Sequence, residues 1–281
     1  MTTRSPKAAV VSLPVLDLRR APDHGSELAS QLLLGEVVQV LGRGRGGRWL
    51  RVRGLTDGYP GWARAWGLIP ATPARGRRWL TRARYEVSVL RTEARSEPGA
   101  GAVVSPLLWR SRLIRHSRRR GHALIELPDG RRGWVAEGSL ARVGRRGAGI
   151  VRRIQSLMGA PYLWGGRSSA ALDCSGFTQL VLAEEGVKLP RDARDQWRVC
   201  TEIPGRETAR LGDLVFFGSA ERGQAHVGLY LGDGYFVHAR GRVGINSLDP
   251  DNLLCDNELN DQFRGIGRPR RTWKPKGPKS A

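Results

Sequence analysis

A cysteine beside an acidic residue is the part of the sequence best suited to chemistry. Cys174 stands in the segment "ALDCSGFTQL", between Asp173 and Ser175, where a helical apolar pattern begins. The nucleophile of a cysteine is its thiolate, and the amide groups at a helix N-terminus favour that anion. The position therefore predicts a nucleophilic Cys174 with a lowered thiol pKa, although a lone cysteine is more often an inert core residue.

Two histidines follow on segments that can supply the base a thiol needs. His226 opens "HVGLYLG" and His238 closes "YFVHA", with the turn sequence "GDG" at 232–234 between them. A hairpin about this turn would place the two histidines on neighbouring strands, where His238 could orient His226. Histidine is the usual base because its pKa lies near neutrality. A thiol, a base and a group that orients the base are the arrangement of a cysteine peptidase.

The elements that must position these residues are predicted by periodicity. Apolar residues at helical spacing predict a helix over 150–158 that Gly159 ends, and a second helix from Asp173 that Gly186 ends. The segments 212–218, 225–239 and 241–248 are typical of strands, so helices precede an antiparallel sheet. This order indicates an α+β domain.

The first half of the chain contains a repeat. Residues 61–70 and 133–142 both begin Gly-Trp and place a leucine six residues after the tryptophan. Each copy follows a strand-like run, "RWLRVRG" or "HALIELPDG", and Gly/Arg-rich turns separate the runs. Short strands with frequent turns predict two small β-barrels, and the closing Gly-Trp strand resembles that of bacterial SH3-like domains.

The second half resembles a known family of enzymes. The segments "PYLWGGRSSAALDCSGFTQLVLAEEGVKLPRDARDQ", "LGDLVFF", "AHVGLYLGDG" and "FVHA" resemble the NlpC/P60 papain-like cysteine peptidases, in the expected order. The resemblance implies that Cys174 is the nucleophile, His226 the general base and His238 the orienting residue. It also implies that Tyr162, in "PYLWGG", donates a hydrogen bond beside the oxyanion site, and that no metal or cofactor takes part.

One branch of this family suggests a substrate. Its members cut peptidoglycan stem peptides between D-isoglutamate and the following diamino acid and require a free N-terminal L-Ala. The resemblance implies that Asp173 and Ser175 bind the substrate's ammonium group and backbone, since a carboxylate pairs with a positive N-terminus. Tyr59 of "GYPGW" and Glu27 would reach from the first barrel and close the groove. Arg191 and Asp192 are expected to support the site in an unspecified way.

These observations predict a domain organisation. The fold class is an α+β papain-like NlpC/P60 catalytic domain preceded by two small SH3-like β-barrels. The expected limits are 8–72 and 76–143 for the barrels, 146–268 for the catalytic domain and 269–281 for a basic, disordered tail.

The charge of the chain indicates little about its partners. The formal net charge is +21, but only five of the 47 basic residues are lysines, a skew more typical of an arginine-rich genome than of a binding patch. We see no nucleic-acid motif and no interleaved aromatics, so we expect no specific nucleic-acid partner, only weak attraction to polyanions. The expected partners are peptides derived from peptidoglycan, and we expect a monomer.

Membrane and redox signals are weak. No apolar run approaches the ~20 residues of a membrane span. Ser12, Pro14 and Asp17 interrupt the N-terminal apolar stretch, which makes it a poor secretory signal. We expect a cytoplasmic protein, or a secreted or periplasmic one if a leader precedes the sequence. The three cysteines form no CxxC pair, so Cys200 and Cys255 are taken as structural.

Two other functions remain open at this point. SH3-like modules could hold cell-wall polymer, with catalysis secondary. Alternatively, a thiol enzyme of the same fold could hydrolyse a different amide or transfer an acyl group.

Overall fold

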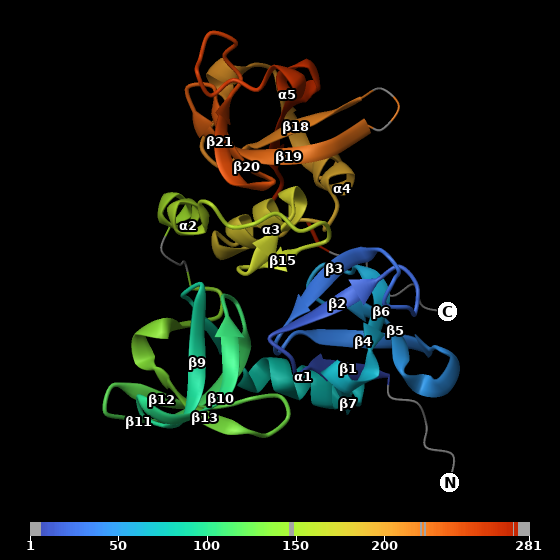
Figure 1. The fold of residues 1–281 in the computed structure, drawn as a ribbon, viewed down its shortest axis with the longest axis vertical. Coiled ribbons are helices and arrows are strands. Elements are labelled where there is room, and N and C mark those ends of the chain that lie inside the picture. Colours follow the sequence, from blue (N-terminus) through green and yellow to red (C-terminus); the bar gives the residue numbers. More distant parts are fainter. Residues whose placement is uncertain (1–6, 146–148, 220, 222, 272, 275–281) are drawn as a thin grey trace. The chain divides into compact units, whose positions relative to one another are not determined.

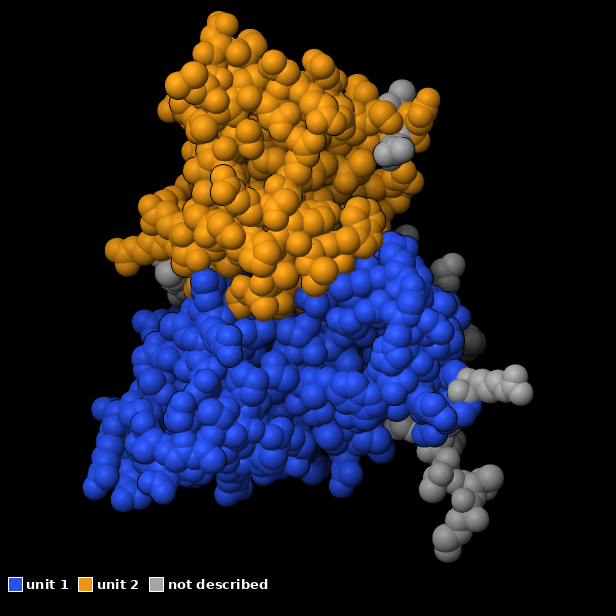
Figure 2. All heavy atoms as spheres, in the orientation of Figure 1, with its two compact units in different colours: residues 1–145 blue, residues 146–281 orange. Residues whose placement is uncertain are grey.

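The chain divides into two compact units, residues 1–145 and 146–281. The computed structural model (Figure 1) describes the chain except for residues 1–6, 146–148, 220, 222, 272 and 275–281. Figure 2 colours the two units separately. Most of the tail predicted over 269–281 lies outside the described residues. No helix in the described part of the chain is both long and apolar enough to cross a membrane.

The first unit contains two seven-stranded sheets with the same strand order. The first sheet runs β3-β2-β6-β5-β4-β1-β7 and the second runs β10-β9-β13-β12-β11-β8-β14, so each strand of the second is the counterpart of the strand seven earlier. The strands of the first sheet are β1 (Ala8–Val11), β2 (Val15–Arg19), β3 (Leu28–Leu33), β4 (Val37–Arg43), β5 (Trp49–Gly54), β6 (Pro60–Arg64) and β7 (Leu68–Ala71). Those of the second are β8 (Tyr85–Val87), β9 (Arg91–Glu97), β10 (Ala100–Leu108), β11 (Arg112–Arg119), β12 (His122–Glu126), β13 (Arg132–Ala136) and β14 (Leu140–Arg142).

The Gly-Trp repeat occupies equivalent strands of the two sheets. Trp62 in β6 pairs with Arg19, and Trp134 in β13 pairs with Arg95. A single turn of 3₁₀ helix follows each strand, η2 (Ala65–Gly67) and η3 (Glu137–Ser139). In the pairing of the described strands both sheets run open from one edge strand to the other, so closed barrels are not confirmed.

Each sheet has its own apolar core. The first core is built from small and branched side chains such as Val11, Leu18 and Val52, and the second from side chains such as Leu107, Leu113 and Ile125. Helix α1 (Pro73–Arg82) lies between the two sheets in sequence, and Thr72 caps its N-terminus. The predicted start of the second barrel at residue 76 therefore falls inside a helix. A further 3₁₀ turn, η1 (Arg45–Gly47), follows β4.

The second unit is a six-stranded antiparallel sheet with helices. The strand order is β17-β22-β18-β19-β20-β21, and a two-stranded ladder of β15 and β16 stands apart from it. The strands are β15 (Arg167–Ser168), β16 (Ala171–Leu172), β17 (Cys200–Ile203), β18 (Leu214–Ser219), β19 (Gly223–Gly232), β20 (Tyr235–Arg240), β21 (Arg242–Ser247) and β22 (Phe263–Pro269). The helices are α2 (Ile150–Leu157), α3 (Cys174–Glu184), α4 (Ala193–Arg198) and α5 (Asn257–Asp261), with a 3₁₀ turn η4 (Arg206–Thr208).

Helix α3 is the central element of this unit. It packs on β19 and β20 of the sheet and on α2 (Figure 1). Nearly all of its residues are buried, which explains why its sequence is apolar rather than amphipathic. The predicted helix 150–158 is confirmed as α2, the helix predicted from Asp173 to Gly186 as α3, and the predicted strands as β18 to β21.

Candidate active site

Cys174 is the first residue of α3. Asp173 is the N-cap, and its side chain accepts a hydrogen bond from the amide of Gly176 at 2.7 Å. The thiol is only 7% exposed and also receives hydrogen bonds from the backbone of Val227, the residue after His226 on β19, and of Ser175. The cysteine is therefore held between a helix start and the strand that carries His226.

The thiol is protonated at rest. Burial, and next the negative charge of Asp173, raise the pKa of Cys174 to about 12. This differs from the lowered pKa expected at a helix N-terminus, because loss of water around the sulfur and the charge of Asp173 outweigh the backbone hydrogen bonds that lower the pKa. A thiolate must therefore form by transfer of its proton to a base as a substrate reacts.

His226 and His238 are hydrogen-bonded to each other. His226 Nε2 lies 2.7 Å from His238 Nδ1, and the rings meet edge-on at 83°. The turn between β19 and β20 has positive φ at Asp233 and Gly234, as a tight hairpin turn requires. His238 faces Gly228 across the ladder, and a Cβ there would approach the Cβ of His238 to 3.2 Å. A glycine at position 228 therefore leaves room for the histidine contact.

Packing against aromatic side chains keeps both imidazoles neutral. Phe217 lies beside His226 with ring centroids 5.9 Å apart, and Phe236 lies beside His238 at 5.2 Å. Burial lowers the pKa of His226 to about 3, and the neighbouring His238 adds to this shift. Burial also lowers the pKa of His238, although its hydrogen bond to Asn246 opposes the shift.

The sulfur and the base are neighbours rather than a bonded pair. Among the contacts of the described residues, the sulfur of Cys174 accepts hydrogen bonds from the backbone of Val227 and of Ser175, and none from the ring of His226. Catalytic hydrogen bonds are often long in ligand-free enzymes and shorten when substrate binds. The structure thus places Cys174 beside the His226 strand, and the roles of the two residues stay predictions.

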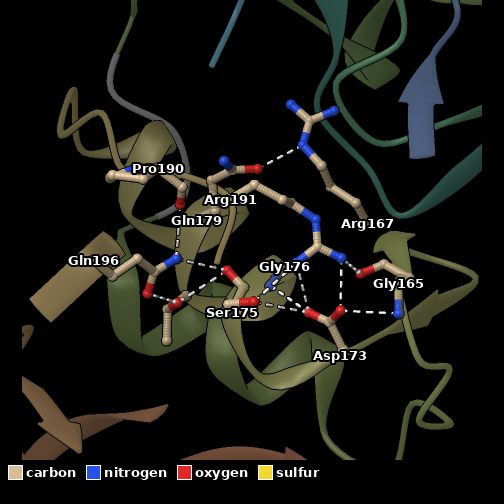
Figure 3. Close-up of polar contacts among 11 residues, drawn as sticks. Gly165, Arg167, Asp173, Ser175, Gly176, Gln179, Pro190, Arg191 and Gln196 are labelled. Carbon is tan, nitrogen blue, oxygen red and sulfur yellow. Dashed lines mark hydrogen bonds and ion pairs between the residues drawn. The ribbon is translucent and has the colours of Figure 1, made fainter. Parts of the chain in front are cut away.

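Asp173 and Ser175 belong to a buried polar network around Arg191 (Figure 3). Arg191, which is 2% exposed, donates to both carboxylate oxygens of Asp173, at 3.0 and 2.5 Å, and to Ser175 Oγ at 2.8 Å. The amide of Gly165 donates to the second oxygen of Asp173 at 3.0 Å. The charge of Asp173 is therefore already compensated inside the protein. Arg191 supports the site, as the sequence led us to expect, and it does so by pairing with Asp173.

A second buried amide ties α4 to α3. The side chain of Gln196, fully buried, donates to the carbonyls of Ser175 and Pro190 at 3.0 Å each (Figure 3). Thr178 Oγ1 donates to its oxygen at 2.8 Å. The first turn of α3, which carries Cys174, is thus held by side chains that the sequence did not single out.

Tyr162 lies close to the thiol. Its backbone amide donates to the carbonyl of Gly241 at 2.9 Å, and its residue bridges to Leu172. Burial raises the pKa of its phenol, and a thiolate at Cys174 and the charge of Asp173 raise it further, so the hydroxyl keeps its proton and can act as a donor. Its predicted place beside an oxyanion remains a prediction.

Tyr59 and Glu27 belong to the first unit, and Arg20 contacts both. The guanidinium lies 5.9 Å from the centre of the Tyr59 ring and 3.6 Å from a carboxylate oxygen of Glu27. The structure therefore brings these two predicted substrate residues together around one cation. Their predicted closure of a groove in the other unit stays a prediction.

Asn246 is a polar neighbour that the sequence did not single out. Its side chain bonds His238 from β21, and "GRVGINSL" carries no motif that distinguishes it from a strand polar residue. Within the described part of the chain, no three His, Cys, Asp or Glu side chains gather as a metal site would require.

The comparisons with known proteins agree with this arrangement. Residues 159–256 match the NlpC/P60 family, and residues 18–67 match the bacterial dipeptidyl-peptidase SH3 domain. The chain is a cysteine peptidase of the NlpC/P60 family, with a bacterial SH3 domain ahead of the papain-like peptidase domain.

Three relatives show how far the likeness extends. A γ-D-glutamyl-L-lysine dipeptidyl-peptidase of Bacillus subtilis is 29% identical over 245 residues, which is 83% of this chain and 79% of the relative. A probable endopeptidase p60 of Listeria seeligeri is 39% identical over 104 residues, but the match covers only 37% of this chain and 19% of that protein. The crystal structure of an NlpC/P60 family protein from Bacillus cereus has a TM-score of 0.79 at 22% identity, covering 93% of this chain and 99% of that one, and shows the same fold.

Proposed function

We propose that the protein hydrolyses the γ-D-glutamyl–diamino acid amide bond of peptidoglycan stem peptides that carry a free N-terminal L-Ala, and that it acts on freed muropeptides in recycling. The observation that carries the proposal is the buried Cys174 beside the strand of the hydrogen-bonded pair His226 and His238. The name of the Bacillus subtilis relative, a γ-D-glutamyl-L-lysine dipeptidyl-peptidase, supports the bond that is cut.

The geometry supports a general-base mechanism. His226 accepts the thiol proton as the sulfur of Cys174 attacks the amide carbon, and His238 orients the base. The C–N bond then breaks, His226 returns the proton to the leaving amine, and a thioester remains. Water attacks the thioester with His226 again as base, which releases the acid and restores the thiol. Tyr162 would donate a hydrogen bond to the oxyanion.

Recognition of the free amine is the second part of the proposal. Glu27 and Tyr59, together with Asp173 and Ser175, would bind the ammonium group and the first peptide unit, with the Asp173 carboxylate shared between the substrate and Arg191. Both Glu27 and Tyr59 lie within the matched dipeptidyl-peptidase SH3 domain, which supports this assignment. Because Arg20 contacts both side chains, a substrate ammonium would take the place of the exposed Arg20 guanidinium.

The test compares two substrates and two cysteine variants. L-Ala-γ-D-Glu-meso-diaminopimelate should be cleaved, and its N-acetylmuramoyl form should not; equal cleavage of both would refute recognition of the free amine. Cys174→Ala should abolish cleavage, while Cys200→Ala should retain it. Cys200 is a matched control because each thiol is 7% exposed. Activity in Cys174→Ala would refute the mechanism.

We also propose that residues 76–143 form a second SH3-like module. The repeated strand order and the equivalent Trp62 and Trp134 pairings support it. Such a module could hold cell-wall polymer, as the alternative binding function requires. Sedimentation with purified sacculi at low and high salt tests this role, and salt-resistant binding without turnover would favour it over catalysis.

A further inference from the structure

The orientation of the Asn246 side chain is fixed by a backbone carbonyl. Its Nδ2 donates to the carbonyl of Leu254 at 2.8 Å, and its Oδ1 lies 2.8 Å from His238 Nε2. A carbonyl oxygen can only accept, so the amide nitrogen must face Leu254. The amide oxygen must then face His238, and the reverse orientation would set two acceptors against each other.

This orientation determines which nitrogen of His238 carries the proton. Because the oxygen of Asn246 accepts, the hydrogen lies on His238 Nε2. A neutral imidazole has one N–H, so His238 Nδ1 presents a lone pair. The 2.7 Å bond to His226 must therefore be donated by His226 Nε2, which leaves the lone pair of His226 on Nδ1.

We infer that Asn246 is a positioning residue that sets the tautomers of both histidines and leaves Nδ1 of His226 as the proton acceptor. This inference rests on the proposed role of His226 as the base. Without the amide oxygen, His238 could carry its hydrogen on Nδ1, and His226 Nε2 would then accept. His226 Nδ1 would hold a proton in that case and could not take one from Cys174.

The surroundings of His226 and His238 keep both imidazoles neutral. An imidazolium at His238 would donate from both nitrogens and would give the unproductive tautomer. Burial of His238 beside Phe236, which itself packs on Phe217, opposes that charge. The guanidinium of Arg240 also opposes a positive charge on His238, even though Arg240 is paired with Asp256 and Glu258. The carboxylate of Asp256 favours that charge. The amide at position 246 favours a proton on His238 only through its hydrogen bond and, unlike a carboxylate, adds no negative charge.

The experiment reads the tautomers directly. In the full-length protein labelled with ¹⁵N-histidine, NMR at neutral pH should show both His226 and His238 with hydrogen on Nε2. Asn246→Leu should change the tautomer of at least one of them. Asn260→Leu is the matched control, because Asn260 is half-buried like Asn246 and its side chain bonds the sulfur of Cys255, not a histidine or Leu254. A wild-type His226 with hydrogen on Nδ1, or unchanged tautomers in Asn246→Leu, would overturn the inference.

Kinetics give the second readout. We expect kcat of Asn246→Leu to fall by about 10²-fold with KM unchanged, less than the ~10⁴-fold cost of a wholly wrong histidine tautomer in a peptidase triad. Asn246→Asp keeps the acceptor, so it should retain more activity and move the acid limb of the pH profile to higher pH. If Cys174→Ala stays active, the proposed function fails, while the NMR result still decides the tautomers.

Discussion

At the scale of single residues, the site is held in a state that needs a substrate to become reactive. The thiol of Cys174 stays protonated and the imidazole of His226 stays neutral, because both are buried. A preformed thiolate–imidazolium pair would require the opposite shifts. The enzyme therefore rests as an uncharged pair, and the proton moves when the sulfur attacks.

The neutral histidines also make stability depend on pH. The pKa of His226 falls from an ordinary 6.5 to about 3 in the folded protein, so between these values the unfolded chain binds more protons. Stability from this group is complete above pH 6.5 and is lost as pH falls toward 3. We expect the free energy of unfolding to decline by about 1 kcal/mol per pH unit from this residue in that window.

Urea titrations at a series of pH values measure this decline. His226→Gln should flatten the slope below pH 6.5. A variant that kept the wild-type slope would contradict a neutral His226 in the folded protein.

At the scale of elements, a buried ion pair joins α2 to α3. Arg153 bonds both carboxylate oxygens of Glu184, at 2.8 and 2.7 Å, and the two side chains are 5% and 6% exposed. Arg153→Met should destabilise the protein by about 3–5 kcal/mol, because it leaves a buried carboxylate unpaired. Arg153→Met combined with Glu184→Leu should recover most of that loss. Chemical denaturation of the single and double variants tests this, and a double variant as unstable as Arg153→Met would contradict it.

The equivalence of the two sheets leads to a second prediction, about the packing of Gly61 and Gly133. A Cβ on Gly61 would lie 3.0 Å from the Cβ of Leu18, and one on Gly133 would lie 3.0 Å from the Cβ of Ala94. Alanine at either position should therefore destabilise the protein by about 1–3 kcal/mol through overpacking. Gly138→Ala is the control, since no atom lies within 4 Å of its Cβ position. Thermal unfolding measures the loss of stability in both variants. A loss inside this range for one variant and outside it for the other would argue against equivalent packing of the two glycines.

Local patterns predicted the elements that carry the reactive residues. Periodicity and the "GDG" turn were enough for α2, α3 and β18 to β21. The strands β17 and β22 were missed because they pair with each other across a long separation, Cys200 with Pro269, and Gly265 and Gly267 interrupt the alternation. Helix α1 was missed because it is rich in arginine and depends on its Thr72 cap.

The site was only partly predictable for the same reason. The two histidines lie either side of a short turn, so their contact follows from local pairing. Arg191 reaches Asp173 from 18 residues away, and Asn246 reaches His238 from the next strand. Only folding brings these partners together, and a polar residue in a loop or strand gives no sign of which atom it will bond.

At the scale of the whole molecule, the positive charge is a surface property. The net charge is +21, while the buried guanidiniums of Arg153 and Arg191 are each paired with a carboxylate. Repulsion among the exposed arginines therefore opposes the compact state.

Salt should relieve that repulsion. The screening length shortens from about 30 Å at 0.01 M to about 8 Å at 0.15 M, so interactions between distant surface charges weaken. We expect Tm to rise on the order of 2–4 °C over this range, which corresponds to about 1 kcal/mol for a protein of this size. Calorimetry in sodium chloride and in potassium chloride should give the same rise, since screening depends on ionic strength and not on the cation. A Tm that falls with salt would mean that surface ion pairs such as Arg240 with Asp256 outweigh the repulsion.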